Sequence, residues 1–409
     1  MPQTAAQSTP SERSRRSLLW CRGLVGIGGV LAIPAAALAV GTFVPAVPYL
    51  GTAGSALLPL FAPQVLVAAL VGGALAVSAR RRAGTALAIV GLLAAAAAGF
   101  VMERHARVGS INGAHVNLLA ALVPRGLGSA TPDATVTFTR VDGQDLELDI
   151  YRPKAAPGTL APILFYIHGG GWIAGDRTMQ AANLRWFADR GYLAVSAEYV
   201  LANDTRATWN TASAEVGCAL TWITANAPTY GADAERVFTF GESAGGALAL
   251  TLGYAAAANT PMSSCGRNIP RVRAVSAEYP AVDPVTFYDN PDPLLGGMAR
   301  QMVGQYLGGN PSDFPVRAQA VASASYINPQ APPTLIFIPD NDHLVPIAGA
   351  LRFIDVATRA GVSVRTVRFP WADHAVNLQY YGVTNQAMVQ ITLQHFCQHG
   401  GRCDVDQRR

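Results

Sequence analysis

Two glycine-rich motifs in this chain carry residues suited to nucleophilic attack on a carbonyl group. The first, Gly241-Glu242-Ser243-Ala244-Gly245-Gly246, follows the apolar run 236–240 and precedes the Ala- and Leu-rich stretch 247–258. A serine between a strand and a helix needs glycine on both sides, because the sharp turn leaves no room for a Cβ and lifts the hydroxyl clear of the sheet. A single Gly-x-Ser-x-Gly in a chain with 40 glycines is weak on its own, but its flanking segments favour Ser243 as a nucleophile.

The second motif, His168-Gly169-Gly170-Gly171-Trp172, follows the apolar run 163–167. Attack on an ester places negative charge on the carbonyl oxygen, and preorganised backbone N–H groups must already point toward that oxygen. We expect the amides of Gly170, Gly171 and Ala244 to form this oxyanion hole. His168 is expected to order the glycine loop by hydrogen bonding and not to act as the base.

The base and the acid are expected downstream of Ser243, in the order Ser, acid, His. Four histidines follow Ser243, at positions 343, 374, 395 and 399. His374 comes after the strand-like run 363–369 and a short loop, which would place it over the strand ends, so it is predicted as the base. The acid is expected in the loop after the buried run 333–338, with Asp342 preferred and Asp340 as the alternative.

These motifs, in this order, resemble the esterase/lipase branch of the α/β-hydrolase fold, including hormone-sensitive-lipase-like and BD-FAE-type carboxylesterases. The resemblance covers about residues 133–397 and rests on HGGGW at 168–172, GESAGG at 241–246, PDNDHLVP at 339–346 and DHAVN at 373–377. It implies Ser243 as nucleophile, Asp342 as acid and His374 as base, with no metal or organic cofactor. The stretch 199–204 departs from the Tyr-Arg-Leu-Ala-Pro-Glu pattern of many relatives, which leaves the subfamily open.

The segments around these motifs alternate strands with helices. Strands are predicted at about 135–139, 146–150, 163–167, 193–199, 236–240, 273–278, 333–338 and 363–369. This alternation predicts a mostly parallel sheet flanked by helices, within a catalytic domain at 130–409. The stretch 283–326 between two strands is rich in Pro, Tyr, Leu and Met and is predicted to be a lid-like insertion, whose apolar residues either line an acyl pocket or pack on the sheet edge.

The preceding residues, 1–129, have a different composition. Half of the whole chain is apolar and only 14% is charged, and the excess of apolar residues lies in three stretches at about 24–43, 56–77 and 85–101. Each is close to the roughly 20 residues that span a bilayer as a helix. The sequence therefore predicts three transmembrane helices before the catalytic domain; soluble buried helices are disfavoured, because they would need a second large core.

Arginine placement predicts the orientation of these helices. Arginines precede the first stretch and occupy 80–82 between the second and third, whereas the loop 51–55 has no charge. The positive-inside rule then puts the N-terminus in the cytoplasm and, after three crossings, the catalytic domain outside. Arg104 and Arg107 argue mildly against this. The competing interpretation is a cleavable secretion signal around Arg15-Arg16, with the twin-arginine type as one form of it, which also exports the hydrolase.

Charge and cysteine usage agree with this division. Residues 1–129 contain ten arginines against two glutamates, so the basic total of +4 reflects the membrane region and gives no support for nucleic-acid binding. Four cysteines lie in the catalytic domain, and in an oxidising compartment Cys218–Cys265 and Cys397–Cys403 are the expected disulfides, with buried free thiols as the alternative. Their scatter excludes a zinc motif.

The sequence as a whole predicts a membrane-anchored serine carboxylesterase or lipase at the cytoplasmic membrane, acting on small-molecule or lipid esters. An envelope acyltransferase with the same triad and a non-catalytic membrane scaffold are the alternatives. A channel or transporter is disfavoured, because the apolar stretches lack charged residues that could line an ion path. Natural substrate, acyl chain length and oligomeric state stay open.

Overall fold

The computed structural model describes residues 10–80, 82–154, 158–266 and 268–403. The chain divides into two compact units, residues 1–104 and 105–409. The boundary falls within helix α4 (Arg82–Ile111), so the expected boundary at residues 129 and 130 lies inside the second unit.

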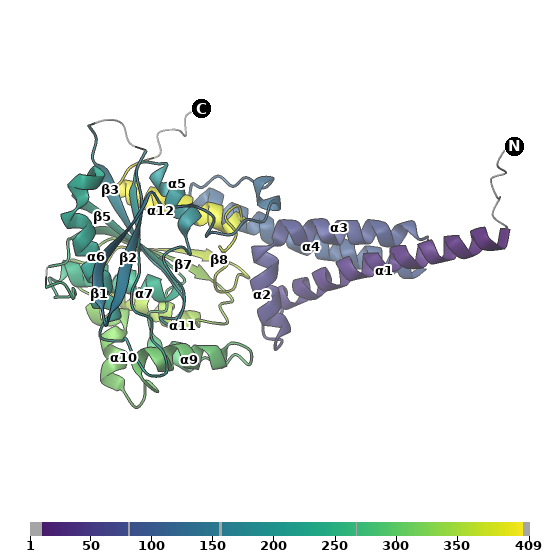
Figure 1. Cartoon of the computed structure of the whole chain (residues 1–409). Helices are drawn as coiled ribbons and strands as arrows, with labels where there is room; N and C mark the ends of the chain where they lie inside the picture. The colour runs from purple at the N-terminus through teal and green to yellow at the C-terminus, as the bar shows by residue number, and fades with distance from the viewer. Residues whose placement is uncertain (1–9, 81, 155–157, 267, 404–409) are drawn as a thin grey trace. The chain divides into compact units, whose positions relative to one another are not determined.

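The first unit is built from helices. They are α1 (Pro10–Phe43), α2 (Leu50–Leu60), α3 (Ala62–Ser78) and the first part of α4 (Figure 1). Two helical segments are long and apolar enough to cross a membrane, Leu19–Phe43 and Arg82–Ile111. They contain the predicted stretches 24–43 and 85–101.

The middle predicted transmembrane helix, 56–77, is wrong as a single straight helix. The chain bends by 99° between α2 and α3, so this pair is either a broken span or a re-entrant loop. Proline explains the break: Pro63 has no N–H to donate to the carbonyl of Pro59, and its ring collides with that carbonyl in a continuous helix. Among the described residues there are therefore two helices that could span a membrane, or three such segments if the bent pair crosses it.

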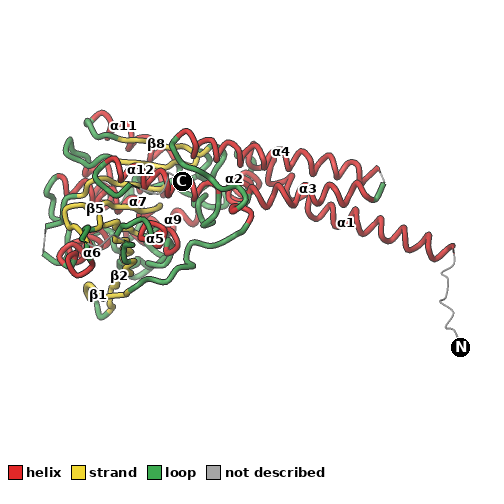
Figure 2. Tube along the Cα trace, turned by 90° about the horizontal axis from the view of Figure 1, so that it is seen from above, coloured by secondary structure: helices red, strands yellow, loops and turns green. Residues whose placement is uncertain are grey.

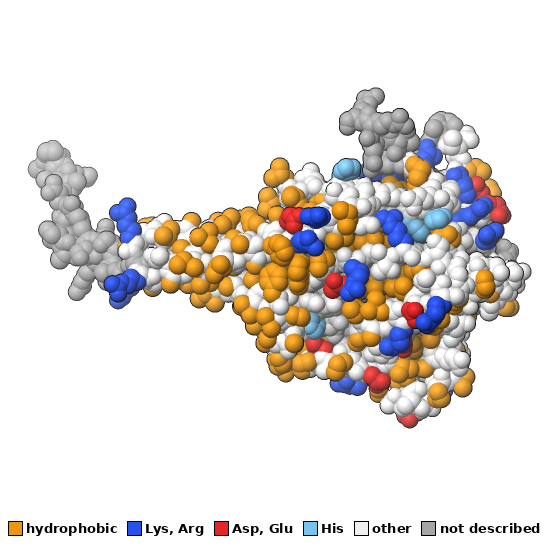
Figure 3. All heavy atoms as spheres, turned by 180° about the vertical axis from the view of Figure 1, so that it is seen from behind, with side chains coloured by type: hydrophobic (Ala, Val, Ile, Leu, Met, Phe, Trp, Pro, Cys, Tyr) orange, Lys and Arg blue, Asp and Glu red, His pale blue; other side chains and the backbone are white. Residues whose placement is uncertain are grey.

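On the face that Figure 3 shows, apolar side chains make up much of the surface of the helical first unit. The exposed ones include Trp20, Ile27, Val30, Ile33, Val67, Leu70, Ile89, Leu92 and Leu93. A water-soluble protein rarely exposes so large a continuous apolar surface, which is typical of a lipid-facing or partner-facing one.

The second unit contains one eight-stranded sheet in the order β1-β2-β4-β3-β5-β6-β7-β8. Its strands are β1 (Ala134–Val141), β2 (Gln144–Tyr151), β3 (Ala161–Ile167), β4 (Leu193–Ala197), β5 (Ala232–Glu242), β6 (Val272–Glu278), β7 (Thr334–Pro339) and β8 (Val364–Phe369). The β1–β2 and β2–β4 pairings are antiparallel and all others are parallel. Every predicted strand is present, and the expected α/β-hydrolase architecture is confirmed.

Helices cover both faces of this sheet (Figure 2). One face packs against α5 (Ala181–Ala188) and α12 (Val383–Gln398), through buried residues such as Phe187 and Phe396. The other packs against α6 (Ala212–Ala225), α7 (Ser243–Ala257) and α11 (Ile347–Arg359). The central strands β3 and β7 are buried along their whole length, as expected for parallel strands covered on both faces.

The expected insertion at 283–326 folds as three short helices and a 3-10 turn. They are α8 (Pro284–Tyr288), α9 (Gly296–Leu307), α10 (Pro315–Val321) and η3 (Ser323–Tyr326). The carboxylate of Asp283 caps α8 by accepting the amides of Val285 and Thr286. Both Phe287 and Tyr306 contact Trp172, so the insertion packs beside the glycine-rich loop.

Residues 105–129 join the second unit through side chains of the C-terminal helix. Gln386 and Gln390 of α12 accept the amides of Asn117 and His115, and Asn112 accepts from Arg365 of β8. These long-range hydrogen bonds explain why the unit begins before the predicted boundary: residues 105–111 are the end of α4, and the stretch after it is held by residues more than 250 positions away.

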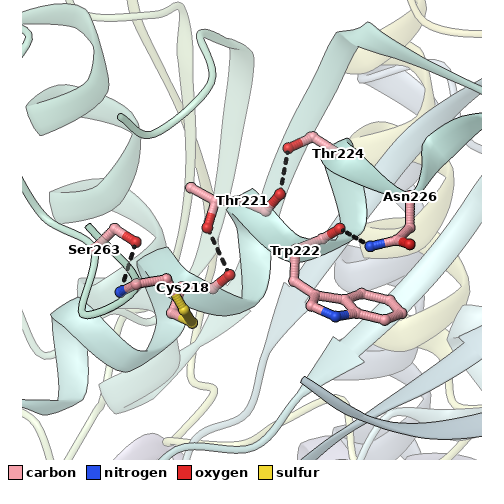
Figure 4. Close-up of a disulfide and its surroundings, with 7 residues drawn as sticks. Cys218, Thr221, Trp222, Thr224, Asn226 and Ser263 are labelled. Atoms are coloured by element: carbon pink, nitrogen blue, oxygen red, sulfur yellow. Dashed lines mark hydrogen bonds between the residues drawn. A yellow bond between two sulfur atoms is a disulfide. The ribbon is translucent and has the colours of Figure 1, made fainter. Parts of the chain in front are cut away.

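Both expected cysteine pairs are joined as disulfides, Cys218–Cys265 and Cys397–Cys403, with Cα–Cα distances of 5.1 and 4.9 Å. The first links α6 to the irregular stretch after α7 (Figure 4). Beside it, the hydroxyl of Ser263 accepts the amide of Cys265. Two chain segments that are 47 residues apart are thus tied together.

Candidate active site

Ser243 lies at the turn between β5 and α7, where the chain reverses direction. Its φ is +52°, a left-handed value that is uncommon for a residue with a side chain. A Cβ on Gly241 would lie 2.3 Å from the carbonyl oxygen of Gly245, and one on Gly245 would lie 2.1 Å from that of Ile167. Glycine is therefore required at both positions, and the structure explains the Gly-x-Ser-x-Gly pattern by close backbone approach.

His374 and Asp342 complete a hydrogen-bonded chain with this serine. Nδ1 of His374 donates to Oδ2 of Asp342 over 2.8 Å, so Nε2 accepts from the hydroxyl of Ser243, 2.9 Å away. The second carboxylate oxygen, Oδ1, accepts the amides of Leu344 and Val345. The three predicted residues come together because they follow the C-terminal ends of the parallel strands β5, β7 and β8, which meet at one edge of the sheet.

The electrostatics of His374 favour its charged form. Burial opposes the imidazolium, but the neighbouring carboxylates of Asp342 and Asp373 outweigh that effect and raise the pKa of His374 above its ordinary value. The rings of His374 and Tyr279 also form a T-shaped contact, with centroids 4.6 Å apart. A histidine in these surroundings is able to take up a proton from a hydroxyl and hold it.

The glycine-rich loop lies directly against the serine. A Cβ on Gly169 would be 3.3 Å from Cβ of Ser243, and Gly170 and Gly171 have φ values of +102° and +60°. Ala244 is the second residue of α7, so its amide belongs to the first helical turn, whose N–H groups have no intrahelical acceptor. Of the three predicted donors, Gly170 and Gly171 thus follow the glycine that contacts Ser243, and Ala244 lies at a helix N-terminus.

His168 and Asp340, which the sequence analysis considered as base and as alternative acid, make other contacts. His168 is buried, hydrogen-bonded through Nδ1 to the carbonyl of Gly169 and stacked on Tyr199, and burial lowers its pKa to about 4. Asp340, the alternative acid, accepts from Nε of Arg368 at 2.7 Å. Neither contacts Ser243 or His374 through the interactions that the structure gives them.

A buried carboxyl network beneath the site was not expected from sequence. Glu242 accepts from Tyr166 and Gln180, while Glu278 accepts from Asn377 over 2.6 Å. Burial raises the pKa of both carboxyl groups, that of Glu278 well above its ordinary value. The only sequence signal is the strand position of both glutamates, each the last residue of its strand.

A second Asp–His pair also escaped sequence reasoning. His343 follows Asp342, and Asp373 precedes His374, and these two neighbours pair with each other at 2.6 Å. The repeated Asp-His doublet in the two loops was the available signal. Among the residues that the structure describes, no group of three or more His, Cys, Asp or Glu side chains is placed to hold a metal ion.

Known proteins resemble part of this chain. Esterase LipQ of Mycobacterium tuberculosis is 29% identical over 242 residues, which is 58% of this chain and 55% of LipQ. Arylacetamide deacetylase of Oryctolagus cuniculus is 38% identical over 124 residues, 29% of this chain and 31% of the deacetylase. The matched region is therefore less than two thirds of either relative.

Solved structures agree on the fold. Esterase 2 of Thermogutta terrifontis superposes with a TM-score of 0.56 at 21% identity, covering 68% of this chain and 97% of that one. The BD-FAE family model matches residues 148–355, which are 208 of the 409 residues and include Ser243 and Asp342. On this match and this fold, the chain belongs to the BD-FAE family.

Proposed function

We propose that this protein is a serine carboxylesterase or lipase, anchored in a membrane, that hydrolyses carboxylic esters through an acyl-enzyme on Ser243. The observation that carries the proposal is the hydrogen-bonded chain from Ser243 through His374 to Asp342, with distances of 2.9 and 2.8 Å. The esterase relatives support the reaction class. One of them, esterase 2 of T. terrifontis, is phosphonylated by sarin and has been seen with propionate bound.

The mechanism follows from the geometry. Nε2 of His374 takes the proton of Ser243 as Oγ attacks the ester carbonyl, and Asp342 holds the ring in the required tautomer and stabilises the imidazolium. The amides of Gly170, Gly171 and Ala244 stabilise the oxyanion. The imidazolium then protonates the leaving alcohol, and water activated by the same histidine releases the acid and frees Ser243.

Membrane anchoring is supported by the first unit. Two apolar helices of sufficient length and an exposed apolar surface favour insertion into a bilayer. The catalytic domain is placed outside the cytoplasm if the bent pair α2–α3 crosses the membrane as a third, broken span. The two disulfides favour that side, since such bonds persist in oxidising compartments.

The proposal is tested with the full chain in detergent, using p-nitrophenyl esters from acetate to palmitate and a fluorophosphonate probe. Hydrolysis and labelling should both disappear in Ser243→Ala, while Ser264→Ala, an exposed serine in the stretch after α7, should keep both. The chain-length optimum separates esterase from lipase. Labelling without hydrolysis would point to an acyl acceptor other than water, and the absence of both would favour a non-catalytic scaffold.

A further inference from the structure

The acid loop and the base loop each contain an Asp-His doublet, and the two doublets pair crosswise. Asp342 of the first loop binds His374 of the second, and His343 of the first binds Asp373 of the second. The two pairs are therefore built from neighbouring residues, and any shift of one loop against the other would disturb both.

Asp373 is the centre of this arrangement. Its side chain is 2% exposed. Its Oδ1 accepts the backbone amides of His343 at 2.8 Å and of His374 at 2.7 Å, and its Oδ2 lies 2.6 Å from Nδ1 of His343. One buried carboxylate thus accepts from three donors in the two loops: two from His343, next to the proposed acid, and one from His374, the proposed base.

The acid loop is held from a second side. Asn290, from the insertion, is buried and donates through Nδ2 to the carbonyls of His343 (2.7 Å) and Leu344 (2.8 Å). With these bonds the backbone of His343 is fixed at both its amide and its carbonyl, so its ring has a defined direction toward Asp373. The pair is consequently a fixed part of the site and not a mobile surface contact.

We propose that His343 and Asp373 are a positioning pair for the esterase reaction: they lock the acid and base loops in register and supply a second fixed negative charge beside His374. This inference rests on the proposed function. It assigns Asp373 an electrostatic role in addition to its structural one, and His343 the role of holding that carboxylate in place.

The charged and titratable groups around His374 support the electrostatic role. Burial is the largest influence on the pKa of His374 and lowers it. Asp342, then Asp373 and, to a smaller extent, Glu242 raise it. Tyr279 makes a T-shaped ring contact with His374, and burial raises the pKa of that phenol well above its ordinary value. Burial raises the pKa of Glu242 and also that of Asp342, but only Asp342 is hydrogen-bonded to His374. The negative charge that acts on the imidazolium therefore comes mainly from the two aspartates.

Asp373→Asn separates charge from structure. The amide oxygen of asparagine retains an acceptor for the two backbone N–H groups, whereas the negative charge is lost. A catalytic base must be neutral to accept a proton, and loss of a nearby negative charge makes its imidazolium more acidic. We expect the acidic limb of the kcat/KM profile for p-nitrophenyl butyrate to move to lower pH by about one unit, and Asp373→Glu to restore the wild-type position.

Variants of His343 test its positioning role independently of the charge of Asp373. His343→Ala removes a side-chain donor to Asp373 and should lower kcat by about 10- to 100-fold through loss of alignment. His343→Gln, which can still donate to the carboxylate, should recover most of that loss and leave the limb in place. Asp340→Asn, in the same loop but paired with Arg368, is the matched control and should change neither quantity.

Two results would overturn the proposal. An unshifted acidic limb in Asp373→Asn would reduce Asp373 to a structural residue, and wild-type kcat in His343→Ala would remove His343 from the positioning pair. Thermal unfolding of each variant by circular dichroism shows whether it is folded. If Asp373→Asn does not fold, the His343 variants still test the proposal. Failure of the proposed function is a separate result. It would be seen if Ser243→Ala hydrolysed esters as fast as wild type, or if wild type hydrolysed none.

Discussion

His374 binds Asp342 through Nδ1, which leaves Nε2 as the atom that faces Ser243. Asp342→Asn should break this assignment, because an amide can present its NH2 group to Nδ1 and favour the opposite tautomer. We expect kcat to fall by about 10³- to 10⁴-fold with little change in KM. The measurement is steady-state hydrolysis of p-nitrophenyl butyrate by the full chain.

The matched control for that substitution is Asp340→Asn. Asp340 lies two residues earlier on the same loop, but its carboxylate pairs with Arg368 and is partly exposed. Activity within about twofold of wild type is expected, as for other surface ion pairs. A larger loss in Asp340→Asn than in Asp342→Asn would reverse the assignment of the acid.

The pKa of His374 fixes the low-pH behaviour of the enzyme. Its carboxylate neighbours raise that pKa above the ordinary histidine value of about 6.5. Since the base must be neutral, activity is lost as pH falls through the raised pKa, so the acidic inflection of kcat/KM should lie above about 6.5. A profile from pH 5 to 9 checks this, and an inflection below pH 6 would contradict it.

Glu278 should make the fold less stable at higher pH. Burial raises its pKa well above the ordinary value, and its Oε1 is buried without a hydrogen-bond partner among the described residues. A raised folded-state pKa gives stability that is complete below the unfolded-state pKa and is lost as pH rises toward the folded-state pKa. Glu278→Gln removes this loss and keeps an acceptor for Asn377.

We expect the free energy of unfolding of the variant, relative to that of wild type, to rise with pH. The rise is at most about 1.4 kcal/mol per pH unit above about pH 4.3. Thermal unfolding at pH 4.5, 6 and 8 measures the trend. A difference in melting temperature that stays constant or shrinks with rising pH would show that Glu278 is ionised in the folded protein.

The bent pair α2–α3 decides on which side the catalytic domain lies. Leu160 is exposed in the second unit and Ala83 is exposed at the start of α4. In spheroplasts that carry a Cys21→Ser background, Leu160→Cys should react with a membrane-impermeant maleimide, and Ala83→Cys only after permeabilisation. The reverse pattern would mean that α2–α3 is re-entrant and that the hydrolase faces the cytoplasm.

The sequence was sufficient for the strands and for singling out Ser243, Asp342 and His374, which the structure joins by hydrogen bonds. Both depend on local rules: apolar strand runs end in turns, and the glycines around Ser243 are required by backbone contacts that any such turn makes. Asp342 could be separated from Asp340 only by motif, and their different partners, His374 and Arg368, are visible only in three dimensions.

The missed features depend on tertiary contacts. The bend at Phe61 was encoded by Pro59 and Pro63, but continuous hydropathy across 56–77 masked that signal. The attachment of residues 105–129 depends on glutamines of α12 that lie more than 250 residues away. The pairing of His343 with Asp373 requires two loops to be adjacent, and no periodicity along the chain reports that.

The order of the strands in the sheet has a consequence for the thermal inactivation of the enzyme. Ser243 follows β5, which has a strand on each side, whereas His374 follows β8, an edge strand that is paired only with β7. Edge elements open locally at lower free energy than central ones. In the hydrogen-bonded chain, Ser243 is thus held by a central strand and His374 by an edge strand. On warming, β8 is expected to open before the turn at Ser243, so this edge strand would set how long such an enzyme keeps its activity.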